Sequence, residues 1–159
     1  MAISFNPINS KALRVNLHTV KTGETIAVGD PVELDADGLI ICATASSAKL
    51  AGVAAQACTS AAAGTKIGIY DDPKQLYLAK ADNVSEVLQA VKGDEVDLIG
   101  STGAFLVNLG ASTTDVFKVV AIGTERNPAL GAASSTFFSY NDGTAVYVEI
   151  NATKHAFGS

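Results

Sequence analysis

The stretch that most constrains the fold is Val28–Ala55, which is rich in turn residues and small apolar residues. Pro31 suits the first position of a strand, because its missing N–H costs little there, and the residues after it alternate between apolar and acidic. Asp35–Gly38 is a typical turn sequence, and the small-residue loop Ala45–Ala48 reverses the chain again. The stretch therefore predicts a β-meander of consecutive strands.

A regular alternation over Leu13–Val20 predicts another strand. The apolar face is Leu13, Val15 and Leu17, and the polar face is Arg14, Asn16 and His18. No cysteine or second histidine stands at metal-ligand spacing from His18, or from His155 in the tail. Both histidines are therefore expected at the surface.

One segment has helical rather than strand spacing, with apolar residues at i, i+3, i+4 and i+7. These residues are Val84, Val87, Leu88 and Val91. Gly93 supplies a C-terminal stop. The spacing predicts a short helix near residues 83–92, and its apolar stripe must pack on a sheet, because a helix of about ten residues is marginal alone.

Two similar segments suggest an internal repeat. Gly29–Leu34 resembles Gly93–Leu98, and each is followed by a small-residue loop and an apolar strand. One hypothesis is that the chain contains two related β-units. The alternative is that Gly-Asp turns before amphipathic strands recur by chance, in which case the strand orders would be unrelated.

Together these patterns predict an all-β, mainly antiparallel fold, either a small barrel or a sandwich, with one short helix near residues 83–92. The expected parts are an N-terminal extended arm at 1–12, a β-meander or barrel unit at 13–81, a connecting helix at 82–93 and a second β-unit at 94–159. The second unit is expected to pack on the first, so that the chain forms a single compact domain.

The N-terminal arm carries two apolar side chains, Phe5 and Ile8, in an otherwise polar segment. Such side chains need a surface to lie on, and that surface can belong to another chain. Phe5, Asn6, Pro7 and Ile8 are therefore the candidate partner-contact residues. The alternative is an ordinary frayed terminus.

Charge and hydropathy exclude several classes of partner. The formal net charge is −5, and the 11 lysine and arginine residues are scattered singly, whereas nucleic-acid binding needs clustered cations. No apolar run approaches the roughly 20 residues that span a bilayer. The N-terminus lacks the basic segment and apolar run of a signal peptide. Neither a nucleic acid nor a membrane is expected as a partner.

No catalytic motif is present. Cys42 and Cys58 are the only cysteines, and two thiols without spaced partners do not complete a zinc site, so both are expected to be reduced. Asp35–Gly38 begins like a calcium loop but lacks the later ligands. We therefore expect no enzyme activity, no catalytic, cofactor-binding or metal-binding residues, and no small-molecule substrate. Several carboxylates could still pair in space: Asp30, Glu33, Asp71, Asp72 and Asp94.

Several loose turn-and-strand motifs follow one another in the chain. A Gly-Asp-x-Val turn and strand begins at Gly29, a Gly-Val pair stands at Gly52, and a Gly-Thr-led strand with alternating isoleucines covers Gly64–Ile69. A Gly-Asp-x-x-Asp-Leu element follows at Gly93–Leu98. In these features the chain resembles the structural cement, or head-decoration, proteins of tailed bacteriophages.

This resemblance implies a structural protein that binds the outer surface of a phage head and stabilises contacts between major capsid subunits. The implied partners are the major capsid protein and further copies of the chain in a homotrimer. The implied location is the exterior of the virion, after assembly in the host cytoplasm.

Two other readings of the sequence stay open. The chain could be another virion or surface interaction module, such as a head-fibre base, a tail-tube domain or an adhesin. It could also be a small β-barrel enzyme or ligand binder, which would require an apolar pocket with convergent polar groups.

Overall fold

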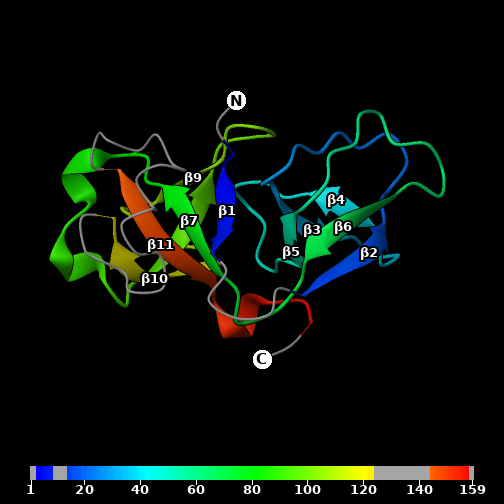
Figure 1. The fold of residues 1–159 in the computed structure, drawn as a ribbon. Coiled ribbons are helices and arrows are strands. Elements are labelled where there is room, and N and C mark those ends of the chain that lie inside the picture. The colour runs from blue at the N-terminus through cyan, green and yellow to red at the C-terminus, as the bar shows by residue number, and fades with distance from the viewer. Residues whose placement is uncertain (1–2, 9–13, 124–143, 158–159) are drawn as a thin grey trace.

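The computed structural model describes residues 3–8, 14–123 and 144–157. Nearly all of its regular structure is antiparallel β-strand, in two sheets that form the two lobes of Figure 1. The predicted all-β, mainly antiparallel class is confirmed. The architecture is sandwich-like, because neither sheet closes into a barrel. In the first sheet an isolated parallel bridge joins Val20 to Ile40, but it does not close that sheet.

The first sheet is five-stranded, in the order β2-β6-β5-β3-β4. Its strands are β2 (Val15–Thr19), β3 (Pro31–Leu34), β4 (Ile40–Cys42), β5 (Gly52–Ala54) and β6 (Lys66–Tyr70). The order corrects the predicted meander, because β3 lies between β4 and β5. The chain after β4 is long enough to cross the end of β3, and both Ala43 N–H and Ala51 N–H donate to β3 carbonyls, those of Pro31 and Val32.

The second sheet is six-stranded, in the order β1-β7-β11-β10-β8-β9. Its strands are β1 (Phe5–Ile8), β7 (Leu76–Lys80), β8 (Glu95–Ile99), β9 (Leu106–Asn108), β10 (Phe117–Ile122) and β11 (Ala145–Ile150). The N-terminal strand β1 therefore lies at one edge of the sheet, antiparallel to β7.

The two sheets have the same topology. Without β1, the second sheet has the order β7-β11-β10-β8-β9, which matches β2-β6-β5-β3-β4 strand for strand, and every pairing in both is antiparallel. Gly29 and Gly93 precede equivalent strands with φ of +88° and +91°. This agrees with the hypothesis of two related β-units, here called the first unit (β2–β6) and the second unit (β7–β11). Strand β7 pairs within the second sheet, and the division into domains stays a prediction.

The predicted helix near residues 83–92 is wrong. Two short 3₁₀ turns, η1 (Val84–Glu86) and η2 (Gln89–Val91), stand in its place, and neither buries a residue. Leu88 between them is extended and 57% exposed. Because half of the apolar stripe stays in solvent, packing does not offset the cost of a helix nucleus.

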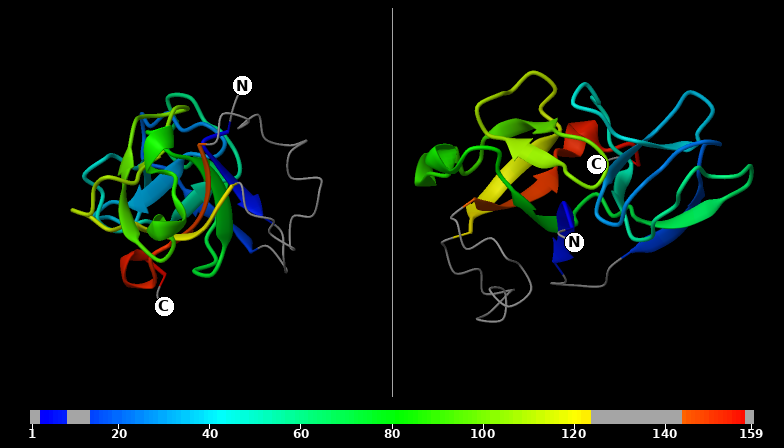
Figure 2. Two further views of the ribbon diagram at one scale, coloured as in Figure 1. Left: turned by 90° about the vertical axis from the view of Figure 1, so that its left-hand side faces the viewer. Right: turned by 90° about the horizontal axis from the view of Figure 1, so that it is seen from above.

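The two units share a core. Phe5 stacks on Phe117, with ring centroids 4.8 Å apart, and meets Tyr77 edge to face. Leu50 and Val53 of the first unit belong to the same buried cluster. The first unit also has a separate apolar cluster of its own. In Figures 1 and 2 the C-terminal segment, with the 3₁₀ turn η4 (Ala152–Lys154), lies between the lobes.

The turn before β3 ties the two units together. Phe5 N–H donates to the Gly29 carbonyl at 3.0 Å, and Gly103 N–H, from the β8–β9 turn, donates to the Asp30 carboxylate at 2.9 Å. Burial raises the pKa of Asp30, although backbone amides of Ala27 and Gly103 oppose the rise. A Cβ at position 29 would collide with the Ile3 side chain, and the positive φ also favours glycine.

Candidate interaction surface

Strand β2 turns its apolar side chains toward solvent. Val15 is 46% exposed and Leu17 is 68% exposed. Asn16 and His18 instead point to the inner side of the strand, where both meet Asp71. The predicted alternation is present, and its polar side is the one that contacts Asp71, although Asn16 itself stays exposed.

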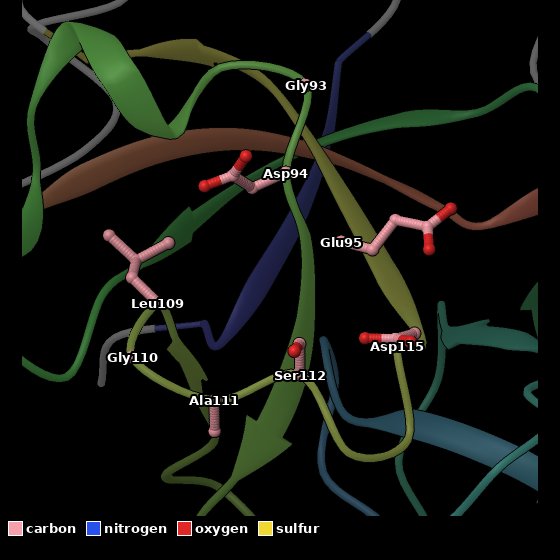
Figure 3. Close-up of a pocket in the computed structure, with 8 residues that line it drawn as sticks. All are labelled: Gly93, Asp94, Glu95, Leu109, Gly110, Ala111, Ser112 and Asp115. Atoms are coloured by element: carbon pink, nitrogen blue, oxygen red, sulfur yellow. The ribbon is translucent and has the colours of Figure 1, made fainter.

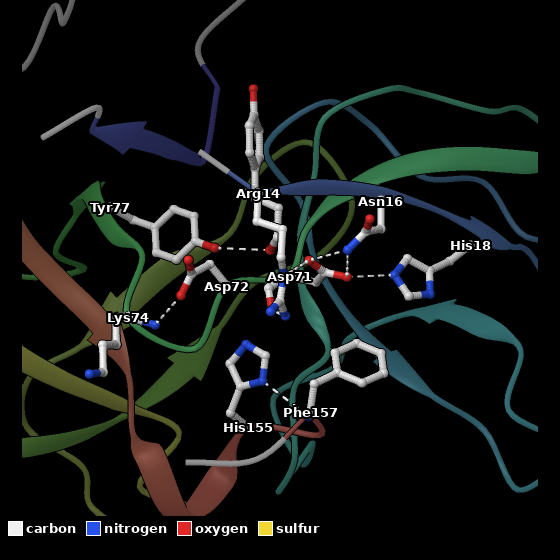
Figure 4. A network of polar contacts seen from close by, with 10 residues as sticks. Arg14, Asn16, His18, Asp71, Asp72, Lys74, Tyr77, His155 and Phe157 are labelled. Carbon is white, nitrogen blue, oxygen red and sulfur yellow. Dashed lines mark hydrogen bonds and ion pairs between the residues drawn. The ribbon is translucent and has the colours of Figure 1, made fainter. Parts of the chain in front are cut away.

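This orientation of β2 follows from one buried carboxylate (Figure 4). The Asp71 side chain is almost fully buried, and it accepts hydrogen bonds from Arg14 Nε at 2.7 Å and Asn16 Nδ2 at 3.0 Å. His18 Nε2 lies 2.8 Å from its other oxygen. A buried carboxylate needs such partners, and these stand at alternate positions of one strand. Satisfying Asp71 therefore sends Val15 to the opposite face.

These partners also set the protonation of Asp71. Burial raises the pKa of its carboxyl, but the hydrogen bonds from Asn16, Arg14 and His18 outweigh burial, so the pKa lies below its ordinary value. The carboxylate is therefore charged near neutral pH and holds the β2 segment by charge-assisted hydrogen bonds.

The C-terminal segment covers this cluster, so the expectation of a surface histidine is wrong for His155, whereas the His18 side chain stays 21% exposed. Phe157 stacks on the His18 ring with centroids 5.2 Å apart, and its N–H donates to His155 Nδ1 at 3.2 Å. His155 is only 2% exposed. Burial first, and then the charge of Arg14, lower the pKa of its imidazole. The segment is held because Leu50 exchanges backbone hydrogen bonds with Lys154 and Ala156.

The candidate contact residues Phe5, Asn6, Pro7 and Ile8 form β1. Phe5 and Ile8 are buried within their own chain, and all four residues pair with β7. Of the rest of the predicted arm, Ile3 and Ser4 are described, and positions 1–2 and 9–12 lie outside the described residues. A contact of β1 with another chain stays a prediction.

Both cysteines are free thiols, as expected. Cys42 is partly buried, and its Sγ lies 3.2 Å from Thr102 Oγ1. Burial raises the pKa of the Cys42 thiol to about 11. A thiol that stays protonated is a weak nucleophile and a weak metal ligand.

A surface pocket of about 510 Å³ lies beside the start of β8, and three of its lining residues are acidic. They are Asp94, Glu95 and Asp115. The carboxylates of Asp94 and Glu95 point away from each other in Figure 3, so they do not converge on a common ligand.

The described part of the chain contains no group of three or more histidine, cysteine or acidic side chains that could hold a metal ion. Within residues 3–8, 14–123 and 144–157 there is also no helix of the length and hydropathy needed to cross a bilayer.

An exposed apolar strand at a sheet edge is the kind of surface through which β-proteins bind partners. Residues 13–69 match the family of phage cement proteins, which confirms the resemblance. The matched residues run from just before β2 to the penultimate residue of β6, so they cover the first unit. No curated protein matches the chain. The family match supports a structural, capsid-associated role in the virion of a phage.

Sequence reasoning found the strand β2 but missed that its apolar face is exposed. The alternation of residues 13–20 gave no sign of which face is buried. The only available signal was indirect: Arg14, Asn16 and His18 are all able to donate a hydrogen bond to one acidic side chain.

Proposed function

We propose that this protein decorates the outer surface of a phage head and stabilises contacts between major capsid subunits. The observation that carries the proposal is the coincidence of the cement-family match with a complete structural unit. The match spans all the strands of the first sheet and includes the Gly29-Asp30 turn that ties the two units together.

Binding as a homotrimer fits this role. Three modest contacts on a regular shell give high avidity, because after the first contact the others are effectively intramolecular. Such adhesion needs no cofactor and no titrating group at the interface. Assembly in the host cytoplasm, a reducing compartment, is compatible with two free thiols.

We also keep β1 as a partner-contact element, in the form of strand exchange. In a trimer, β1 of one copy can occupy the same position on β7 of a neighbour. Phe5 would then contact Tyr77 and Phe117 of the neighbouring chain in the geometry seen here within one chain. Exchange of an identical element loses no contacts, which makes it an inexpensive route to an oligomer.

The direct test mixes purified protein with expanded, undecorated heads and pellets the heads. We expect the protein to sediment with the heads in saturable amount, and the decorated heads to retain their DNA to a higher temperature. Heads that already carry a full complement of the protein serve as the control and should take up none. Absence of the protein from the pellet would contradict the proposal.

A further inference from the structure

The backbone of the C-terminal segment, residues 151–157, is attached to the first unit by one isolated bridge, between Leu50 and His155. Leu50 N–H donates to the Lys154 carbonyl, and Ala156 N–H donates to the Leu50 carbonyl, each at 2.8 Å. Ala156 also packs at the margin of the apolar cluster of the first unit. Because the segment contains no strand, and its only regular element is η4, it can leave the first unit without breaking a strand pairing of either sheet.

His155 is the buried residue at the centre of this attachment. Its Nδ1 accepts the Phe157 N–H at 3.2 Å, which requires that Nδ1 carries no proton. In the neutral ring the proton is therefore on Nε2, which is buried and has no hydrogen-bond partner among the described residues. The imidazole is thus held in its neutral form, as an acceptor for the segment's own backbone.

A second proton on His155 is unfavourable in this position. The charged groups that act on the ring are the Arg14 guanidinium, before β2, and the carboxylates of Asp71 and Asp72, in the turn after β6 (Figure 4). Burial, and then the charge of Arg14, outweigh the two carboxylates, so the pKa of the imidazole is lowered. Protonation would also turn Nδ1 into a donor that faces the Phe157 N–H. The attached segment therefore accommodates the neutral ring and opposes the charged one.

His18, the other histidine of this cluster, does not act in the same way. Its Nε2 lies 2.8 Å from an oxygen of Asp71, so a proton on His18 has a carboxylate as its partner. Phe157 stacks on its ring with centroids 5.2 Å apart, and a charged ring is still a suitable partner for an aromatic face. Protonation of His18 therefore leaves its contact with the segment intact, and His155 is the histidine whose charge opposes attachment.

We propose that residues 151–157 form an acid-released latch, and that protonation of His155 detaches them from the first unit while both sheets stay folded. In the detached segment the charged imidazole is solvated, and its Nδ1–H no longer opposes the Phe157 N–H. Because the detached state binds the proton more readily, detachment becomes more favourable as the pH falls below about 6.5. Release uncovers the Asp71 cluster and leaves the shared core, which contains Phe5 and Phe117, to hold the two units together.

Amide hydrogen exchange of the free protein, followed by nuclear magnetic resonance, tests the latch. The reporters are the amides of Leu50 and Ala156, and the reference is Ala55 N–H, which donates to the Gly68 carbonyl of β6 at 2.8 Å. We expect reporter protection at least about tenfold below that of the reference at both pH 7.5 and pH 5, since the segment opens locally. Between these pH values reporter protection should fall about tenfold, within the limit of about thirtyfold for one proton taken up near pH 6.5.

Two variants identify the sensor. His155→Asn retains a side-chain acceptor for the Phe157 N–H but takes up no proton, so its reporter protection should not change with pH. His18→Asn is the matched control and should keep the fall of about tenfold, because the responding histidine is still present. If His155→Asn does not fold, the wild type still decides: a fall that begins only near pH 4, where carboxylates titrate, would assign the response to an acidic side chain and overturn the proposal.

Three further results would overturn the latch. Reporter and reference amides with equal protection would mean that the segment detaches only when the whole chain unfolds. Reporter protection that is the same at pH 7.5 and pH 5 would mean that no proton is linked to detachment. An unchanged pH dependence in His155→Asn would assign the proton to another group. All of these measurements use the free protein, so the latch and the proposed binding to phage heads stand or fail separately.

Discussion

At the scale of single residues, the buried carboxylate of Asp71 fixes the orientation of β2. Arg14 Nε, Asn16 Nδ2 and His18 Nε2 all lie within 3.0 Å of its oxygens. The cost of burying one carboxylate is met by three side chains in and just before β2, and the consequence is an outward-facing Leu17. Asp71 is therefore both a stabilising residue and the origin of the exposed apolar face.

We predict that Asp71→Ala destabilises the protein by about 3 kcal/mol, because it leaves the partially buried donors of β2 without an acceptor. Urea unfolding measures the change. Asp72→Ala is the matched control: its carboxylate accepts from Lys74 N–H in an exposed turn, and its loss should cost no more than about 1 kcal/mol. Equal effects of the two substitutions would contradict this role of Asp71.

A second prediction concerns pH. The pKa of His155 is lowered in the folded state, so the unfolded chain binds a proton more readily, and stability must fall as the pH drops below the unfolded value of about 6.5. The melting temperature should therefore decrease between pH 7.5 and pH 5. His155→Asn retains an acceptor for Phe157 N–H and should flatten this dependence. A wild-type melting temperature that is constant over this range would contradict the prediction.

The same residues show what sequence could not provide. The alternation over residues 13–20 was sufficient to identify a strand, since it depends only on local spacing. Which face is buried depends on Asp71, more than fifty residues away in the sequence, and on Phe157 at the other end of the chain. These are tertiary contacts, which local periodicity does not encode.

At the scale of elements, the main result is that β2 and β7 are equivalent strands with different coverage. Strand β1 pairs with the outer edge of β7, whereas no described strand pairs with the outer edge of β2. The Gly-Asp turns predicted the starts of the equivalent strands β3 and β8. The order around them was not predictable from turns alone, because a nine-residue connection at 43–51 can either form a hairpin or cross a neighbouring strand. The apolar stripe at 84–91 had helical spacing, but only Val87 and Val91 pack on the core while Val84 and Leu88 stay exposed.

The exchange of β1 can be tested by a cysteine pair. Asn6 and Leu78 are partners across β1 and β7, so Asn6→Cys with Leu78→Cys should form a disulfide. Both native thiols are first replaced by serine. If β1 is exchanged, oxidation of the assembled trimer yields covalently linked chains on a non-reducing gel. A product that remains a single chain would show that β1 stays on its own β7.

At the scale of the whole molecule, the two units are not independent bodies. Leu50 and Val53 of the first unit pack in the same cluster as Phe5 and Phe117, and the C-terminal segment returns from β11 to cover the first unit. The cement-family segment is therefore a structural unit that completes its core with the rest of the chain.

This sharing of the core predicts that a fragment of residues 13–75 does not fold by itself. It would lack β1, the second unit and the C-terminal segment, and it would expose the apolar side chains that face them. We expect a poorly dispersed amide spectrum and no cooperative thermal transition, in contrast to the full chain. A dispersed spectrum with a cooperative transition would show instead that the first unit is an autonomous domain.

The central claim is that this protein binds the outside of a phage head. The most direct measurement is a density map of expanded heads mixed with the protein, at a resolution that separates β-strands. We predict additional density on the outer surface where capsid subunits meet, fitted by this chain. Heads whose outer surface carries no such density at saturating protein concentration would contradict the account.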